Sequence, residues 1–383
     1  MNTFTRRSFL TGVTAFSFAN RSLWSLGKHE KRIFIGTYTK KTSKGVYTSR
    51  WMPETGELVD IILAAETSNP SFLALSPNRK NLYAVNELDN YQGAKSGAVS
   101  AFSIGHGSGK LALRNEVPSG GTGPCNTAVD HTGQVLFVAD YDNGSVATFR
   151  ILPDGGLSQP ATDIHYSGHS VDVKRQKGAH THCTTVSPDN RYVLVNDLGL
   201  DRIMVYRFDP KTAILTPNDP PFYSAIPGSG PRNLAFHPNG RWAYSTNELG
   251  GTVDGLDWNS TTGTLTRFQN ISTVPSDFKQ FNAPAMTVVH PNGRFAYVSN
   301  RGHDSIAAYS VDPEDGHLTL LQYISCGGKF PRHFAVDPKG RWLIVANQNS
   351  ANVVVLACNA HTGRLTKTGR QYSLDSPVCV VFE

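Results

Sequence analysis

The residues best suited to chemistry in this sequence recur at one position of a repeated hairpin. In the copy that runs from Pro231 to Glu248, the turn is centred on Gly240, the midpoint between Arg232 and Glu248. Antiparallel pairing around this turn predicts that Arg232 and Glu248 lie side by side at the end of the hairpin away from the turn. Aligning the other copies on their turns gives the matching pairs Ser71 with Glu87, Cys125 with Tyr141, His182 with Leu198, Ala285 with Arg301 and Arg332 with Gln348, and a partial match at Tyr38.

If these strands line one channel, a ring of ionisable side chains surrounds its mouth: His182, Arg232, Arg332, Glu248, Arg301, Glu87 and Tyr141. Such a ring is suited to binding an anion, because several arginines confined to one place repel one another unless a counter-charge or a ligand is present. The alternative is structural, since polar residues at strand ends of propellers also satisfy backbone groups or hold channel water. The number of charged groups favours a functional ring.

A histidine pair raises the question of a metal. His180 stands two residues before His182 and shares its face, because side chains alternate along a strand. No third histidine or carboxylate ligand can be placed beside this pair, so we expect no metal site. The sequence also lacks a serine nucleophile elbow, a phosphate-cradling loop and a Rossmann fingerprint.

An internal repeat must position these residues. A turn followed by alternating apolar residues begins at Ser76 and returns at Asp130, Ser187, His237, His290 and Asp337. A second and a third strand element follow each copy, and the spacing is about 50 residues with no helical period. Seven units of four short strands predict an all-β fold, a seven-bladed β-propeller with four antiparallel strands per blade.

The two ends of the chain are expected to close the ring. Residues 32–38 resemble the second strand of a blade with no first strand ahead of it, and residues 376–382 resemble the missing first strand. Pairing of these N- and C-terminal strands would complete blade one and remove the open edge. Residues 32–383 are therefore predicted to form a single domain.

The first residues are expected to lie outside this domain. Arg6-Arg7, followed by an uncharged apolar stretch over residues 9–19, resembles a twin-arginine export motif. We expect residues 1–19 to be a signal peptide, residues 20–31 to be a linker, and the protein to be periplasmic or secreted. The alternative is a disordered cytosolic N-terminus that contains two arginines.

Composition excludes several classes of protein. Lys and Arg number 36 against 30 Asp and Glu, a formal net charge of +6, and the excess is spread along the chain. With no basic block, nucleic acid is not an expected partner, and no apolar stretch reaches the ~18 residues that span a bilayer. The five cysteines are scattered and odd in number, so buried thiols are expected rather than disulfides.

At the ring residues the sequence resembles the lactonase family of seven-bladed propellers, which includes bacterial 6-phosphogluconolactonase and the fungal carboxymuconate-lactonizing enzyme. The likeness covers nearly all of the chain after the export motif. It is carried by the segments Ile33-Phe34-Ile35-Gly36-Thr37-Tyr38-Thr39, Asp197-Leu198-Gly199-Leu200-Asp201-Arg202, Gly230-Pro231-Arg232, Asn247-Glu248-Leu249 and Ser299-Asn300-Arg301-Gly302-His303-Asp304-Ser305-Ile306.

The resemblance implies a catalytic group of one histidine, two arginines and a glutamate. The matching positions are His182 (or His180), Arg232, Glu248 and Arg301, and His180, Arg332, Glu87 and Tyr141 are expected to bind substrate. The chain departs from the family pattern at three places, where Asn126 and Asn233 replace histidines and Ala285-Met286 replace a glutamate. These departures put the exact substrate in question.

The implied reaction is hydrolysis of a sugar-derived lactone, 6-phosphogluconolactonase-like or, given export, acting on an unphosphorylated aldonolactone. Glu248 or His182 would activate water, the arginines would bind an acidic substrate and stabilise the oxyanion, and no metal or organic cofactor is required. The alternatives are a lyase that closes a lactone on muconate, and a non-catalytic propeller that binds a small acidic ligand or a protein partner.

Overall fold

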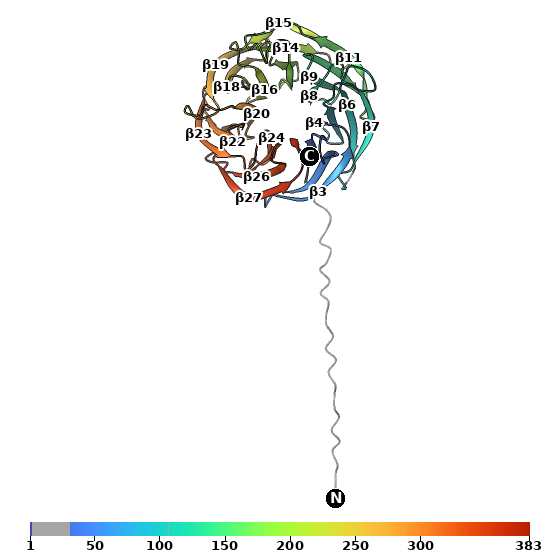
Figure 1. Ribbon diagram of the computed structural model, residues 1–383, viewed down its shortest axis with the longest axis vertical. Coiled ribbons are helices and arrows are strands. Elements are labelled where there is room, and N and C mark those ends of the chain that lie inside the picture. Colours follow the sequence, from blue (N-terminus) through green and yellow to red (C-terminus); the bar gives the residue numbers. More distant parts are fainter. Residues whose placement is uncertain (2–30, 106) are drawn as a thin grey trace. The chain divides into compact units, whose positions relative to one another are not determined.

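The computed structural model describes residue 1, residues 31–105 and residues 107–383. The described chain forms seven four-stranded antiparallel sheets, arranged as blades around a central channel (Figure 1). The strand order and the number of blades confirm the predicted all-β seven-bladed propeller. The predicted signal peptide and linker lie outside the described residues, apart from Met1 and from Lys31, where β1 begins.

Each blade runs from an inner strand at the channel to an outer strand at the perimeter (Figure 1). The inner strands are β28 (Pro377–Phe382), β4 (Pro70–Leu75), β8 (Pro124–Val129), β12 (Thr181–Val186), β16 (Pro231–Phe236), β20 (Ala283–Val289) and β24 (Pro331–Val336). The second strands are β1 (Lys31–Thr37), β5 (Asn81–Asn86), β9 (Val135–Asp140), β13 (Tyr192–Asp197), β17 (Trp242–Asn247), β21 (Phe295–Arg301) and β25 (Trp342–Asn347). The third strands are β2 (Gly45–Met52), β6 (Ala98–Ile104), β10 (Ser145–Ile151), β14 (Arg202–Phe208), β18 (Thr252–Asn259), β22 (Ser305–Val311) and β26 (Asn352–Cys358). The outer strands are β3 (Glu57–Glu66), β7 (Leu111–Pro118), β11 (Leu157–His165), β15 (Leu215–Ser224), β19 (Thr264–Ser272), β23 (Leu318–Ser325) and β27 (Leu365–Ser373).

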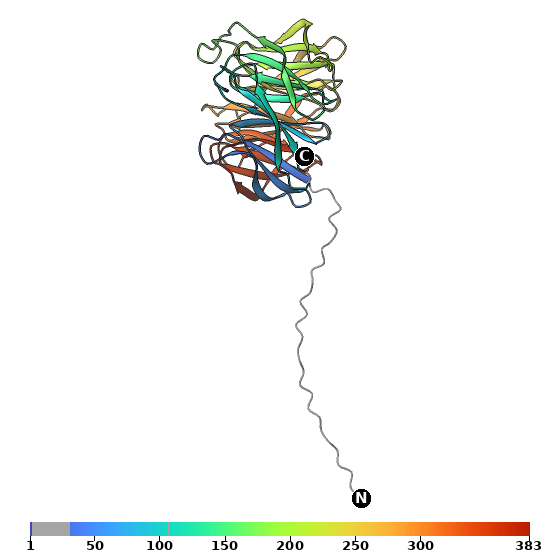
Figure 2. The ribbon, with the colours of Figure 1, turned by 90° about the vertical axis from the view of Figure 1, so that its right-hand side faces the viewer.

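The ring closes by pairing the two ends of the propeller, as predicted. β28 pairs antiparallel with β1, with Ile33 opposite Phe382 and Ile35 opposite Val380. The C-terminus therefore lies among the blue strands that begin the chain (Figures 1 and 2). This pairing gives blade one its inner strand and leaves β1 without an open edge.

Burial follows the position of a strand in its blade. Second strands such as β9 and β13 are buried at every residue, because neighbouring blades cover both of their faces. After its first residue, the outer strand β27 consists of partly buried and exposed residues that largely alternate. Continuous apolar runs therefore specify the middle of each blade, and alternating runs specify its perimeter.

The repeated turns hold neighbouring blades together. His237 Nε2 donates to the carbonyl of Gly293 in the next blade's turn at 2.7 Å, and His290 Nε2 donates to the carbonyl of Gly340 at 2.8 Å. Both glycines adopt positive φ, the conformation that this turn requires. These two histidines therefore have a structural role in holding the blades together.

The inner hairpins contain an irregularity that the turn-centred alignment missed. Pro231 lies opposite Asn247 and Asn233 opposite Thr246, so Arg232 has no partner across the ladder. The predicted cross-strand pairing of Arg232 with Glu248 is therefore wrong in register, and the Glu248 amide instead donates to the Gly230 carbonyl. The same one-residue β-bulge occurs at Ser71, Cys125, His182, Arg332 and Val378. A bulge re-aims a side chain, and here it directs the bulged side chain into the channel.

All five cysteines are free, buried thiols. Burial raises the pKa values of Cys125 and Cys379, which keeps both as neutral thiols. No helix long and apolar enough to cross a membrane occurs in the part of the chain that the structure describes.

Candidate functional site

The centre of the site is one buried carboxylate that contacts three arginines. Glu248 Oε2 lies 2.6 Å from Arg301 Nη2 and 2.9 Å from Arg232 Nε, and Oε1 accepts a hydrogen bond from Arg175 Nη2 at 2.8 Å. The side chains of Glu248, Arg232 and Arg301 are each 6% exposed. Both carboxylate oxygens are thus committed to guanidinium groups.

Three different parts of the ring supply these arginines. Arg232 reaches the carboxylate from the bulge in β16, and its Nη1 donates to the carbonyl of Ala285 in the next blade. Arg301 ends β21, and its Nε donates to the Ala283 carbonyl at 3.0 Å. Arg175 lies in the loop between β11 and β12. Only closure of the ring brings the three together.

The electrostatics of this cluster favour the ionised carboxylate. Burial alone would raise the pKa of Glu248, but the positive charges of Arg301 and Arg232 outweigh burial and hold the pKa well below its usual range. Burial and the neighbouring Arg301 lower the pKa of Arg232 to about 9, so this guanidinium remains charged at neutral pH. Glu248 is consequently a counter-ion with little basicity.

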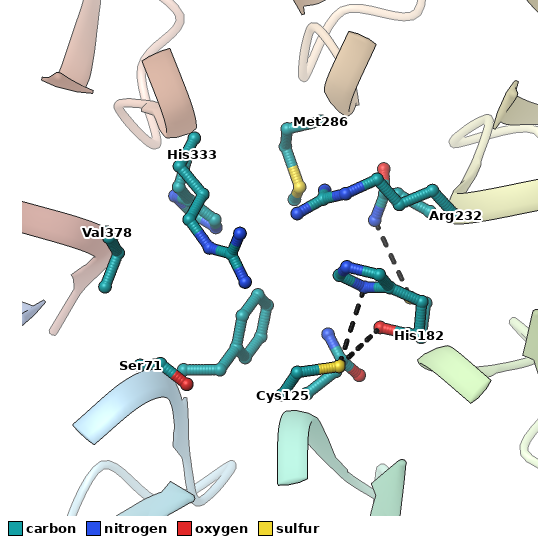
Figure 3. A pocket seen from close by; sticks show the side chains of 12 residues that line it. Ser71, Cys125, His182, Arg232, Met286, His333 and Val378 are labelled. Carbon is teal, nitrogen blue, oxygen red and sulfur yellow. Dashed lines mark hydrogen bonds between the residues drawn. The ribbon is translucent and has the colours of Figure 1, made fainter. Parts of the chain in front are cut away.

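His182 lies beside this cluster and faces the channel. Its Nδ1 is 3.7 Å from Cys125 Sγ, and its Nε2 has no hydrogen-bond partner among the described residues. Burial, reinforced by the positive charge of Arg232, holds the pKa of His182 well below its usual value. Figure 3 shows His182, Arg232 and His333 pointing from different inner strands toward the centre. His182 is therefore a neutral imidazole at neutral pH.

A second charged cluster lies at the same mouth. Tyr38 Oη donates to the Glu87 carboxylate at 2.8 Å, and Arg332 Nη2 lies 3.8 Å from Glu87 Oε2. Although burial lowers the pKa of Arg332, Tyr38 and Glu87 raise it above its usual value. Arg332 is thus a permanent cation opposite the Glu248 cluster.

His180 and His182 have different surroundings despite their spacing. The bulge at His182 breaks the alternation that would have placed them on one face. The His180 ring stacks on Tyr141 with centroids 4.6 Å apart, and its Nδ1 donates to the Tyr141 carbonyl at 2.8 Å. The Tyr141 hydroxyl in turn accepts from Arg175 at 3.0 Å. His180 therefore supports Tyr141 instead of lining the channel.

These groups surround a cavity of about 250 Å3. Its wall consists of Tyr38, Glu87, Cys125, Tyr141, Asp142, Arg175, His182, Glu248, Arg301 and Arg332. It adjoins a narrower space of about 20 Å3, roughly one water molecule, whose lining includes Arg232 and His333. The three arginines of the cavity wall balance its two glutamates and one aspartate, and Arg232 in the adjoining space adds a positive surplus suited to an anionic ligand.

The three departures from the family pattern lie in that narrow part of the channel. Asn126 Oδ1 accepts the backbone amide of Thr184 at 2.9 Å, and Asn233 Oδ1 accepts that of Thr287 at the same distance. His333 Nδ1 plays the same part toward Val380 at 3.3 Å. Met286 is the equivalent residue of blade six, and it lines the same constriction. The asparagines at these positions bridge adjacent blades. They are not part of the wall of the larger cavity, so the two departures leave that wall unchanged.

The sequence reasoning placed His182, Glu248, Arg301, Arg332, Glu87 and Tyr141 at one mouth, and the structure brings all six around the cavity, with Arg232 in the adjoining space. It missed Arg175, because the loop 166–180 lies outside the repeat on which the alignment rested. The sequence of this loop shows no alternation or turn signal that would single out Arg175. No group of three or more His, Cys, Asp or Glu residues suited to a metal occurs within residues 31–105 and 107–383.

Comparison with known proteins agrees with this architecture. The family model "Lactonase, 7-bladed beta-propeller" matches residues 32–382. The 6-phosphogluconolactonase of Bacillus subtilis is 35% identical over 91% of this chain and 97% of its own, and that of Formosa agariphila is 32% identical over 88% and 94%. The crystal structure of a periplasmic gluconolactonase from Pseudomonas aeruginosa superposes with a TM-score of 0.86 at 34% identity, covering 92% of this chain and 98% of that one.

The match spans every blade, and the two 6-phosphogluconolactonases are covered over 97% and 94% of their own lengths. The fold, the length of the match and the identity with these relatives together show that this chain belongs to the lactonase family of seven-bladed β-propellers.

Proposed function

We propose that this protein hydrolyses a sugar-derived lactone in the cavity beside Arg232, with His182, Arg232, Glu248 and Arg301 as the catalytic group. The observation that supports this most directly is the neutral His182 imidazole beside a carboxylate that contacts three arginines. Ester hydrolysis needs an activated water, an oxyanion stabiliser and a proton for the leaving alkoxide.

His182 is the better candidate for the general base. Both oxygens of Glu248 are occupied by guanidinium groups, whereas Nε2 of His182 has no hydrogen-bond partner among the described residues and can accept a proton. The Cys125 thiol donates its hydrogen to the Thr181 carbonyl, so the sulfur can accept the Nδ1–H of His182. In this tautomer Nε2 is unprotonated, and its lone pair faces the cavity. The imidazolium formed when water is deprotonated then passes its proton to the ring oxygen of the lactone.

The arginines would bind the carbonyl oxygen and stabilise its negative charge. Arg301 uses Nε and Nη2 within the protein, and its Nη1 has no acceptor among the described residues. A guanidinium fixed by a carboxylate is pre-organised, so little reorganisation accompanies the developing charge. Glu248 acts here by holding the arginines in place, and its charge stabilises the transient imidazolium.

The relatives suggest the substrate class. A 6-phosphogluconolactonase and a gluconolactonase both open the lactone of a sugar acid. Hydrolysis of glucono-1,5-lactone can be followed by proton release, with the spontaneous rate subtracted. We expect acceleration by the wild type, retained in His165→Gln on exposed β11 and lost by at least about 100-fold in His182→Gln. A wild-type rate equal to the spontaneous rate would contradict the proposal and, if gluconate still binds, would favour a non-catalytic propeller.

We also propose that residues 1–19 are a twin-arginine signal peptide, that residues 20–31 are a linker to a single propeller domain, and that the protein acts in the periplasm or outside the cell. The Arg6-Arg7 pair supports this, and the related gluconolactonase of Pseudomonas aeruginosa is described as periplasmic. Replacing both arginines with lysine should leave the full-length precursor in the cytoplasm. Unchanged export would show that the N-terminus has another role.

A further inference from the structure

A second cavity of about 460 Å3 opens beside the proposed catalytic cavity. The two share Tyr38, Glu87, Arg301 and Arg332 as walls, so a ligand at Arg301 can extend from one into the other. The other walls of the second cavity come from parts of the chain that the proposed mechanism does not use. They combine an aromatic ring, an amide and two lysines.

The aromatic ring belongs to Phe330, which has an unfavourable backbone conformation. Its φ of 62° lies in the left-handed region, where bulky residues are rare. The same position, directly before the proline of an inner strand, is Gly123 in blade three and Gly230 in blade five, with φ of 64° and 63°. A hydrogen bond from the Phe330 amide to Asp304 Oδ1 at 2.7 Å holds this conformation.

The fold therefore accommodates glycine at this position more easily than phenylalanine. A strained residue at a cavity wall suggests a role beyond packing. The Phe330 ring lies 5.2 Å from the Arg301 guanidinium carbon, so it flanks the arginine on the side of the second cavity. It offers a flat apolar surface next to the group that would bind the lactone carbonyl.

Lys40 and Lys41 also line this cavity, and neither has a carboxylate partner among the described residues. Their loop is anchored on both sides, by the bond from the Thr39 amide to Asn69 Oδ1 at 2.9 Å and by the bond from the Thr42 amide to Asp375 Oδ2 at 2.7 Å. Lys40 Nζ is 5.5 Å from the centroid of the Tyr38 ring.

The Arg332 guanidinium carbon also lies 5.5 Å from the centroid of the Tyr38 ring. The charged groups of Lys40 and Arg332 are therefore separated by no more than twice 5.5 Å. Gln348 also forms part of the wall of this cavity. The unpaired lysines would attract an anionic group at the outer end of the ligand.

We propose that the second cavity is a specificity subsite for the end of the substrate distal to the lactone carbonyl. Phe330 packs against the carbon skeleton, and Lys40 and Lys41 bind a second acidic group, a phosphate ester or a carboxylate. The ligand class is thus an aldonic acid derivative with two negative charges after ring opening. This inference rests on the proposed function for the site, but its test does not depend on turnover.

Calorimetry with ring-opened acids tests the lysines. We expect the wild type to bind 6-phosphogluconate and glucarate, one bearing phosphate and one a second carboxylate, more tightly than gluconate by about tenfold or more. The double variant Lys40→Gln/Lys41→Gln should lose this preference. The matched double variant Lys80→Gln/Lys367→Gln, which removes the same charge from exposed positions elsewhere, should keep it. Preference for only one diacid identifies the second group. Equal preference in both double variants, or no preference in the wild type, overturns the subsite.

Phe330→Asn tests the aromatic wall, because asparagine tolerates left-handed φ as Asn69 does at the equivalent place in blade two. We expect a melting temperature equal to or above that of the wild type, gluconate affinity reduced by about tenfold, and recovery in Phe330→Tyr. Unchanged affinity, or a lowered melting temperature with normal affinity, overturns this role. If lactone turnover is absent while these binding differences persist, the proposed function fails and the subsite stands.

Discussion

Arg175 donates a hydrogen bond to Glu248 across 73 residues of sequence, at 2.8 Å. Arg175 belongs to the loop that enters blade four, whereas Glu248 follows the second strand of blade five. The same guanidinium nitrogen also contacts the Tyr141 hydroxyl of blade three at 3.0 Å. A single side chain thus fixes the carboxylate relative to two other blades, and the charge cluster at the mouth is a product of the closed ring.

Arg175 should therefore act as a positioning residue. Its side chain is 42% exposed, so Arg175→Ala should change the melting temperature little, while kcat/KM for a lactone falls by about tenfold because Glu248 and Tyr141 lose a common partner. Arg175→Lys keeps the charge, but its side chain is shorter and its ammonium lacks the planar geometry of the guanidinium, so only partial recovery is expected. Full activity in Arg175→Ala would contradict this role.

Glu248→Gln should destabilise the protein, because it leaves buried guanidinium groups without a counter-charge. We expect a loss of about 3 kcal/mol in the free energy of unfolding, measured by denaturant titration. An added anion should partly replace the carboxylate, so gluconate or phosphate should raise the melting temperature of Glu248→Gln more than that of the wild type. Equal shifts in both proteins would show that the arginines do not face the ligand site.

The pH dependence of kcat/KM should reveal His182. A base must be unprotonated, and burial together with Arg232 holds the pKa of His182 well below its usual value. Activity should therefore stay constant as the pH is lowered from 8 through the ordinary histidine range near 6.5, and fall only below it. Arg232→Met removes the second of these causes, so the fall should move to higher pH. An inflection near 6.5 in the wild type would indicate an exposed histidine as the base.

His333 should contribute a defined part of the acid sensitivity of the fold. Burial and the charges of Arg232 and Arg332 lower its pKa to about 3. Below about pH 6.5 the unfolded chain binds a proton on this histidine and the native state does not, so stability falls as the pH falls. The slope is about 1.4 kcal/mol per pH unit and ends near the folded pKa.

His333→Asn provides the matched comparison, because Asn126 and Asn233 accept the next blade's amide at the equivalent positions. The variant should fold at pH 7 and show a shallower loss of unfolding free energy between pH 6 and 4. Urea titrations at several pH values measure this difference. Parallel curves for the two proteins would mean that His333 is already protonated in the native state.

The sequence by itself determined the propeller and the location of its site. Seven copies of the turn and strand specified seven blades. The strand at residues 32–38, which has no inner strand ahead of it in the sequence, required the C-terminal strand as its partner. Both inferences depend on local patterns, because the turn residues and the alternating apolar residues of a hairpin occur within one short segment of sequence. The proximity of Arg232 and Glu248 followed from the same local reasoning.

The tertiary structure decided the details on which chemistry depends. The bulge at Arg232 changes the register by one residue and turns its side chain into the channel, and no turn-centred alignment contains that information. Arg175 and Lys40 lie in loops outside the repeat, and the interblade role of Asn233 appears only when blade five meets blade six. Contacts between blades depend on how a twisted sheet closes into a ring, a long-range constraint that no segment of the sequence carries alone.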